Sequence, residues 1–203
     1  MNRLFGTMAY ACGAMDRVDD GGAGWRNDIE PFINSLGAGF LNPCDKPISI
    51  GLEDAEHRDR RHELKMSGDF ESMSTEMKTI RAVDLRMVDI AHFLVVNINL
   101  DHKPCGTIEE IVTANRQRKP ILIQVDQGKS ACPDWILGML GPKGHNMIFD
   151  TWEELKDYLT MIDSGSEEEV AHLNRHGRWV FFDFHKIFNN NVAGFTGYKH
   201  CQA

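Results

Sequence analysis

The chain has 203 residues, 26% of them charged, and a formal net charge of −8. Wrapping a nucleic acid requires clustered Lys and Arg side chains, so this negative balance disfavours polymeric nucleic acid as a partner and leaves a single nucleotide or nucleoside open. A hydrophobic content of 42% at this length is typical of one globular domain with at most a small appendage.

Apolar runs that end at Gly, Pro or Asn alternate with segments of helical spacing. The runs predict strands at 4–11, 39–42, 93–98, 120–125 and 146–149. The helical spacing predicts helices from about residue 27 to Gly37 and then at 75–89, 107–118 and 151–162. Pro31 then falls in the first turn of the first helix, where its missing N–H is tolerated. The charged stretch 53–65 has little apolar periodicity, and we expect a solvated surface insertion or lid there.

Strands that alternate with helices are typical of a parallel sheet covered on both faces. We therefore predict an α/β fold, a flavodoxin-like doubly wound sheet of five parallel strands, with a C-terminal extension. The α/β domain is expected to span 1–163. The extension, 164–203, is expected to hold an added strand near 178–184 and an irregular tail.

Cysteine usage and hydropathy indicate a reducing compartment. The five cysteines are scattered and form no C-x-x-C pair, which favours neither a disulfide framework nor a thiolate zinc site. No run approaches the ~18 apolar residues of a membrane span, and the N-terminus lacks the pattern of a signal peptide. We expect a cytoplasmic protein with no metal, no cofactor and no membrane contact.

Ligands of such sheets bind beyond the carboxyl ends of the strands, where the strand order reverses. The candidate site therefore lies in the loops at 10–16, 97–107 and 125–129. Tyr10 places a phenol at one strand end, and Gly13 follows where a ligand could approach the backbone. Glu109 and Glu110 fall in the first turn of a predicted helix, whose dipole would stabilise an ionised carboxylate.

Asp84 is the second candidate acid. It falls on the apolar stripe of the helix predicted at 75–89, where a lone carboxyl group would be costly. An ionised carboxylate over an anomeric carbon, with a second carboxyl group about 5 Å away, performs retaining glycosyl transfer. Structural interpretations stay open: Glu110 could be a surface residue at a helix end, Asp84 could pair with a neighbouring arginine, and Tyr10 could be a core residue.

A series of short motifs follows in order along the chain: Tyr10-Ala11-Cys12-Gly13, Gly24-Trp25-Arg26, Gly39-Phe40-Leu41-Asn42-Pro43, Asp84-Leu85, Gly106-Thr107-x-x-Glu110 and Lys119-Pro120-Ile121. In order and spacing this series resembles the nucleoside 2-deoxyribosyltransferase family and its relatives, the 2'-deoxynucleoside 5'-monophosphate N-glycosidases. The resemblance runs from about residue 4 to residue 162 and does not include the C-terminal extension.

The resemblance implies roles for individual residues. Glu110 would attack C1' of the deoxyribose and form a covalent glycosyl-enzyme, Asp84 would protonate the leaving base, and Tyr10 would orient Glu110. Substrate contacts would come from Gly13, Trp25, Arg26, Asn97, Asp101 and Gly106. The resemblance also implies a homo-oligomer, a dimer or larger, whose partners are a deoxynucleoside or deoxynucleotide and a free nucleobase.

Two places depart from the family pattern. Pro104 stands where the transferases have an Asp for the sugar 5'-hydroxyl and the hydrolases a Ser for phosphate, and Asp101 could take over the hydroxyl. Asp16 stands near the position of a phosphate-binding Arg in the hydrolases and would repel a phosphate. We therefore expect a deoxyribosyltransferase acting on 2'-deoxynucleosides. The alternatives are a hydrolase that releases free base from 2'-deoxynucleoside 5'-monophosphates, and a non-catalytic nucleotide-sensing module.

Overall fold

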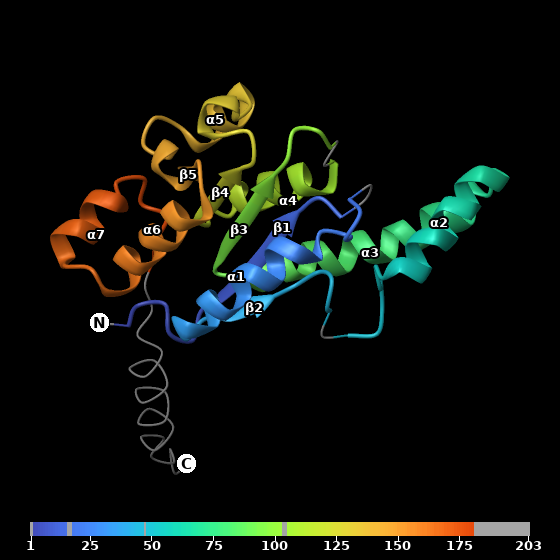
Figure 1. Cartoon of the computed structure of the whole chain (residues 1–203), viewed down its shortest axis with the longest axis horizontal. Coiled ribbons are helices and arrows are strands. Elements are labelled where there is room, and N and C mark those ends of the chain that lie inside the picture. The colour runs from blue at the N-terminus through green and yellow to red at the C-terminus, as the bar shows by residue number, and fades with distance from the viewer. Residues whose placement is uncertain (1, 16–17, 47, 103–104, 181–203) are drawn as a thin grey trace, which may run out of the picture.

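The computed structural model describes residues 2–15, 18–46, 48–102 and 105–180 of the chain (Figure 1). Its elements, in chain order, are β1 (Met8–Gly13), α1 (Ala23–Ser35), β2 (Gly39–Leu41), α2 (Ala55–Ser67), α3 (Phe70–Ile90), β3 (Phe93–Ile98), α4 (Cys105–Arg116), β4 (Ile121–Val125), a 3-10 turn (Lys129–Ala131), α5 (Asp134–Leu140), a second 3-10 turn (His145–Met147), β5 (Ile148–Phe149), α6 (Trp152–Ser164) and α7 (Glu167–Leu173).

The strands form one parallel sheet in the order β2-β1-β3-β4-β5. Helices cover both faces: α3 and α4 pack side by side behind the sheet in Figure 1, and α1 and α6 lie in front. Every residue of β3 and β4 is buried, as expected of central strands covered on both sides. The predicted flavodoxin-like α/β fold is therefore confirmed, and its strand order reverses between β1 and β3.

The first strand starts later than the sequence predicted. Residues 3–6 form a turn, and β1 begins at Met8. The apolar character that suggested strand at Leu4 has another cause: this side chain is fully buried, and its backbone N–H donates to Asp163 Oδ1 at 2.8 Å. The N-terminus is thereby attached to the end of α6.

The first helix starts earlier than predicted. It begins at Ala23, so Pro31 lies inside the helix and not in its first turn. Pro31 cannot donate to the carbonyl of Asn27, which stands four residues earlier. Both residues are exposed, so water can satisfy that carbonyl. The helix ends as predicted, with Gly37 in the left-handed conformation at φ 74°.

The charged stretch predicted as an insertion folds into α2, which packs along the N-terminal half of α3 and projects with it beyond the sheet (Figure 1). Asp54 caps this helix by accepting from the backbone N–H of His57 at 2.9 Å. Most of its side chains are exposed, as expected, but Arg61 is buried and lies near Glu76 of α3 at 3.5 Å.

The beginning of the predicted C-terminal extension packs on the α/β domain. Trp179 is buried, lies 5.3 Å from Phe93 between ring centroids, and donates from Nε1 to Tyr158 Oη at 3.0 Å. The predicted strand at 178–184 is wrong for residues 178–180, which belong to no strand, and its remainder lies outside the described residues. Within the described ranges, no helix is long and apolar enough to cross a membrane.

Candidate functional site

The candidate site lies where the strand order reverses, at the carboxyl ends of β1 and β3. Gly13, the last residue of β1, stands in register with Asn97 of β3. The helix that follows β3 is α4, and it carries Glu110 over the end of β1. This is the position at which doubly wound sheets place ligands.

Glu110 is 9% exposed, and each of its carboxylate oxygens accepts a hydrogen bond from β1. Tyr10 Oη donates to Oε1 at 2.7 Å, and Cys12 Sγ donates to Oε2 at 2.9 Å. Tyr10 and Cys12 point the same way because alternate residues of a strand share a face. Burial and the charge of Glu110 raise the pKa of both donors well above the usual range, so they stay protonated at neutral pH.

The support for the Glu110 charge differs from the sequence prediction. Helix α4 begins at Cys105 rather than at residue 107, so Glu109 and Glu110 lie in its second turn, beyond the strongest field of the helix terminus. Burial raises the pKa of Glu110, and the hydrogen bonds from Cys12 and Tyr10 act in the opposite direction. The hydrogen bonds from Cys12 and Tyr10, together with the positive charge of Arg26, therefore favour its ionised form.

Glu109 does not belong to the site. Its side chain points outward, and its Oε2 accepts from Arg81 Nε of α3 at 2.7 Å. This bond is between exposed groups, and it holds the pKa of Glu109 below the usual range. Of the two adjacent glutamates, only Glu110 faces the carboxyl end of β1.

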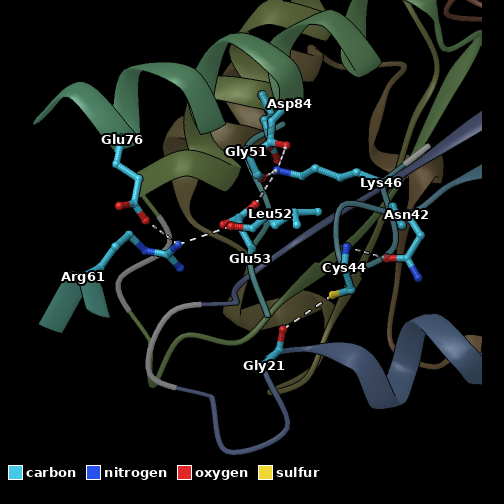
Figure 2. A network of polar contacts seen from close by, with 12 residues as sticks. Gly21, Asn42, Cys44, Lys46, Gly51, Leu52, Glu53, Arg61, Glu76 and Asp84 are labelled. Carbon is cyan, nitrogen blue, oxygen red and sulfur yellow. Dashed lines mark hydrogen bonds and ion pairs between the residues drawn. The ribbon is translucent and has the colours of Figure 1, made fainter. Parts of the chain in front are cut away.

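Asp84 of α3 pairs with Lys46 and not with a neighbouring arginine. Lys46 Nζ lies 2.8 Å from Asp84 Oδ1, and the lysine side chain is 1% exposed (Figure 2). The same ammonium donates to Glu53 Oε1 at 2.8 Å and to the carbonyl of Gly51 at 2.7 Å. The lysine thus donates two hydrogen bonds, and it contacts Asp84 as an ion pair, since Asp84 Oδ1 accepts no hydrogen bond from the described residues.

The environment of Asp84 favours its protonated form. Burial, together with the negative charge of Glu53, raises the pKa of Asp84 to about 7, although Lys46 acts in the opposite direction. The charge of Glu110 also raises this pKa, and the charge of Asp84 raises that of Tyr10. The charges of the two carboxyl groups therefore affect each other.

The segment that carries Lys46 is fixed at both ends (Figure 2). On one side the backbone N–H of Cys44 donates to Asn42 Oδ1 at 2.9 Å. On the other, Arg61 Nη1 of α2 donates to the carbonyl of Leu52 at 3.5 Å. Helix α2, which the sequence suggested only as an insertion or lid, thus helps to hold Lys46 and Glu53 against Asp84.

A cavity of about 520 Å³ lies beside this segment, between α2 and α3. Gly51 and Leu52 line one side of it, and Thr79 of α3 lines another. Glu110 and Asp84 do not line it, so the cavity is adjacent to the two carboxyl groups and separate from them.

The aromatic residue predicted to contact substrate forms a stacked pair. Trp25 of α1 stacks on Trp152 of α6, with 5.2 Å between centroids and an interplanar angle of 14°. This contact explains Gly13 better than close approach of a ligand does. A Cβ on Gly13 would lie 2.9 Å from Trp25 Cζ2 and 3.2 Å from the carbonyl of Asn97, so Trp25 itself fills the space.

Arg26 is fully buried, and its guanidinium is directed at the backbone. It donates to the carbonyls of Ala11 at 3.2 Å, Gly22 at 2.6 Å and Gly13 at 2.9 Å. Its guanidinium also lies 4.5 Å from the centre of the Trp25 ring. Arg26 therefore fixes the turn after β1 and supports Trp25.

The other predicted substrate contacts lie at different depths. Asn97 is buried, and its Nδ2 donates to Gln124 Oε1 and Asp126 Oδ1, both at 2.7 Å. Asp101 is exposed, and its Oδ2 accepts from Gln127 Nε2 at 3.3 Å. Gly106 has open space around its α-carbon, and no steric reason requires glycine there. Asp16 and Pro104, the departures from the family pattern, lie outside the described residues.

Sequence analysis missed the roles of Cys12, Lys46, Glu53 and Trp152. Cys12 could have been found, because it stands two residues after Tyr10 on the same strand face. Lys46 and Glu53 reach Asp84 from a loop distant in sequence, and no local pattern marks a lysine for burial. In the described part of the chain, no group of three or more His, Cys, Asp or Glu residues is arranged to hold a metal ion.

Comparisons with known proteins find matches among solved structures but none to a family model or a curated protein. Among solved structures, the chain is similar to the 2-desoxiribosyltransferase from Leishmania mexicana, at 15% sequence identity and a TM-score of 0.40. The similarity covers 59% of this chain and 65% of that protein, so the chain spans just under two thirds of its length.

Proposed function

We propose that the chain cleaves the N-glycosidic bond of 2'-deoxynucleosides and transfers the deoxyribosyl group through a covalent ester on Glu110. One observation carries the proposal: a buried carboxylate with both oxygens held by protonated donors stands at the strand-order reversal, within electrostatic reach of a second carboxyl group of pKa about 7. The resemblance of the motif series to the nucleoside 2-deoxyribosyltransferase family supports deoxynucleosides as the substrate class.

The first step uses Glu110 as an anion and Asp84 as an acid. A carboxylate oxygen of Glu110 attacks C1', and the bond between C1' and the base nitrogen breaks with its electron pair moving to the base. Asp84 donates its proton to the base, which leaves in neutral form. Tyr10 and Cys12 keep the attacking carboxylate in one orientation.

In the second step, Asp84 acts as a base. Asp84, now ionised, accepts a proton from the acceptor, which is a second base or water. The acceptor attacks C1', and the ester bond to Glu110 breaks to restore its carboxylate. Between the two steps, Lys46 stabilises the ionised form of Asp84 across their 2.8 Å contact.

The surroundings favour a nucleoside over a 5'-monophosphate. The Arg26 guanidinium is buried and donates to three backbone carbonyls, so it is not presented to a phosphate. Asp101 is exposed and carries an acceptor suited to a sugar hydroxyl.

Product analysis tests the proposal. The protein is incubated with each of the four deoxynucleosides and with their 5'-monophosphates, with and without an added base, and the products are separated by chromatography. We expect free base or a new nucleoside from at least one deoxynucleoside. Glu110→Gln should reduce that rate by about 10³-fold or more.

Glu109→Gln is the matched control, because it removes the adjacent carboxylate, which points away from the site. Its rate should stay within a factor of about two of the unmodified chain. Unchanged turnover in Glu110→Gln would overturn the proposal. So would binding of intact nucleotides without any turnover, the behaviour of a sensor.

A further inference from the structure

A second cavity, of about 540 Å³, lies where α4 ends and before β4 begins, at the amino end of β4. The candidate site lies at the carboxyl ends of the strands. Its charged and polar lining consists of Asn115, Arg118, Lys143, Arg175, His176 and Arg178. No Asp or Glu lines it, although the chain as a whole has 30 acidic residues against 22 basic ones. The cavity therefore concentrates positive charge on an otherwise negative protein.

Arg178 is anchored as a fixed cation in this cavity. Its Nη2 donates to Asn115 Oδ1 at 2.7 Å, and its Nη1 donates to the carbonyl of Lys119 at 3.2 Å. Burial and the nearby charge of Arg118 lower the pKa of Arg178. The two guanidinium groups thus repel each other, and an anion between them would relieve that repulsion.

Arg118 occupies a backbone position that favours glycine. Its φ is 58°, in the left-handed region, two residues after α4 ends at Arg116. The helix end is already capped by the backbone, because the N–H of Arg118 donates to the carbonyl of Asn115 and that of Lys119 to the carbonyl of Ala114. The cap does not need the arginine side chain.

Arg118 and Lys143 also have no carboxylate partner. Among the described residues, neither side chain takes part in a hydrogen bond or an ion pair. Both side chains are exposed and free to close on a ligand. An arginine held in an unfavourable conformation, and left unpaired beside other cations, has an evident use if the ligand is an anion.

His176 does not add charge at neutral pH. Burial and Arg178 lower its pKa to about 4. Its Nδ1 accepts from the backbone N–H of Arg178 at 3.2 Å, and its Nε2 lies 3.4 Å from Tyr158 Oη. The histidine thus positions the segment that carries Arg178, and the positive charge of the cavity comes from three arginines and one lysine.

We propose that this cavity is a binding site for a phosphate-bearing small molecule, separate from the glycosyl-transfer site and independent of it. A guanidinium group can donate two parallel hydrogen bonds to the oxygens of one phosphate. No acidic residue lines the cavity, so its charge disfavours a cation as the ligand. The volume exceeds what a single phosphate ion needs and lies in the range of sites for small organic ligands.

Calorimetric titration of the full chain with inorganic pyrophosphate, at low ionic strength and in a buffer free of phosphate, tests the proposal. We expect saturable binding at one site with a Kd below about 1 mM, weakened by added salt. Arg118→Gly removes the cation and places glycine where φ is 58°. This variant should raise the Kd about tenfold or more while its Tm stays unchanged or rises.

Arg116→Ala is the matched control, because Arg116 is an exposed arginine of the same helix end that does not line the cavity. Its Kd should change less than about twofold. Equal weakening in both variants would mean diffuse attraction and would overturn the proposal, as would no binding of pyrophosphate. A deoxynucleoside monophosphate that loses affinity in Arg118→Gly and binds more tightly than pyrophosphate would identify a nucleotide as the ligand; equal affinity would identify the phosphate alone.

Discussion

The two carboxyl groups of the candidate site are contacted by different kinds of group. Glu110 lies against neutral donors on a central strand, a phenol at 2.7 Å and a thiol at 2.9 Å. Asp84 lies among charges, with an ammonium at 2.8 Å and Glu53 bound to the same ammonium. The first environment is built from β1, an inner strand of the sheet, and the second from a loop held by α2.

This difference suits two chemical tasks. Neutral donors orient a carboxylate without neutralising it, so Glu110 keeps electron density for attack on carbon. Burial and the charge of Glu53 raise the pKa of Asp84 to about 7, near the value at which a group can both donate and accept a proton. The following variants test whether the two environments are as distinct as this comparison holds.

Asp84→Asn should have the largest effect among these variants. The amide cannot donate a proton to the leaving base, and we expect kcat to fall by about 10² to 10⁴-fold. A substrate whose base leaves readily without protonation should lose much less. Rates are compared with those of Asp89→Asn, which alters an exposed carboxylate on the same helix. A loss below about threefold would remove Asp84 from the proposed mechanism.

Tyr10→Phe should have the next largest effect. It deletes a hydrogen bond to a buried carboxylate, and kcat should fall by about 10 to 100-fold. Cys12→Ala should cost less than about tenfold, because a thiol is the weaker donor. Tyr158→Phe, remote from the site, serves as the control and should leave kcat unchanged. If Cys12→Ala proved more damaging than Tyr10→Phe, the assignment of the main orienting donor would be reversed.

Glu53→Gln should shift the pH profile rather than abolish activity. Asp84 acts as an acid, so kcat/KM should fall as the pH rises through about 7. The charge of Glu53 raises the pKa of Asp84, so removing that charge should move this alkaline limb to lower pH. Glu63→Gln, an exposed glutamate of α2, should leave it in place. A limb that moved to higher pH would contradict the electrostatic account.

Two glycine substitutions should have the smallest effects, and these concern stability. They distinguish a glycine that close packing requires from one that has free space around it. Gly13→Ala brings a methyl group within 2.9 Å of Trp25 Cζ2, and should lower the free energy of unfolding; such overpacking costs about 1–3 kcal/mol. Gly106→Ala meets no atom within 4 Å in the first turn of α4 and should be neutral or stabilising; alanine in a helix gains about 0.5–1 kcal/mol over glycine. Urea unfolding measures both, and similar values for the two would contradict the packing at Gly13.

Local sequence patterns were sufficient to predict most of the fold. The uniformly apolar runs of β3 and β4 identified central strands of a parallel sheet. Helix starts were less accessible, because their signals were weak. Gly22, the residue before α1, adopts a left-handed conformation and offers no side-chain cap. In the glycine-rich segment around it, the start of the helix therefore could not be told from a loop by sequence. Because the start of α4 was predicted two residues too late, Glu110 was wrongly assigned to its first turn.

The site was predictable where it depends on the fold and unpredictable where it depends on distant contacts. The family resemblance implied the pairing of Tyr10 with Glu110, and the strand order explains it, because it places Tyr10 beneath the helix after β3. The partner of Asp84 was not predicted, because a lysine is seldom buried and Lys46 reaches Asp84 across 38 positions only once α2 and α3 have packed.

Trapping of the covalent intermediate tests the central claim most directly. A nucleoside that carries fluorine at C2' on the arabinosyl face slows breakdown of a glycosyl ester, since fluorine destabilises the oxocarbenium-like transition state. After incubation and proteolysis, mass spectrometry should find the added sugar on the peptide that contains Glu110, and none on that peptide in Glu110→Gln. A sugar attached to any other residue, or turnover of this substrate with no adduct at any time, would contradict the account.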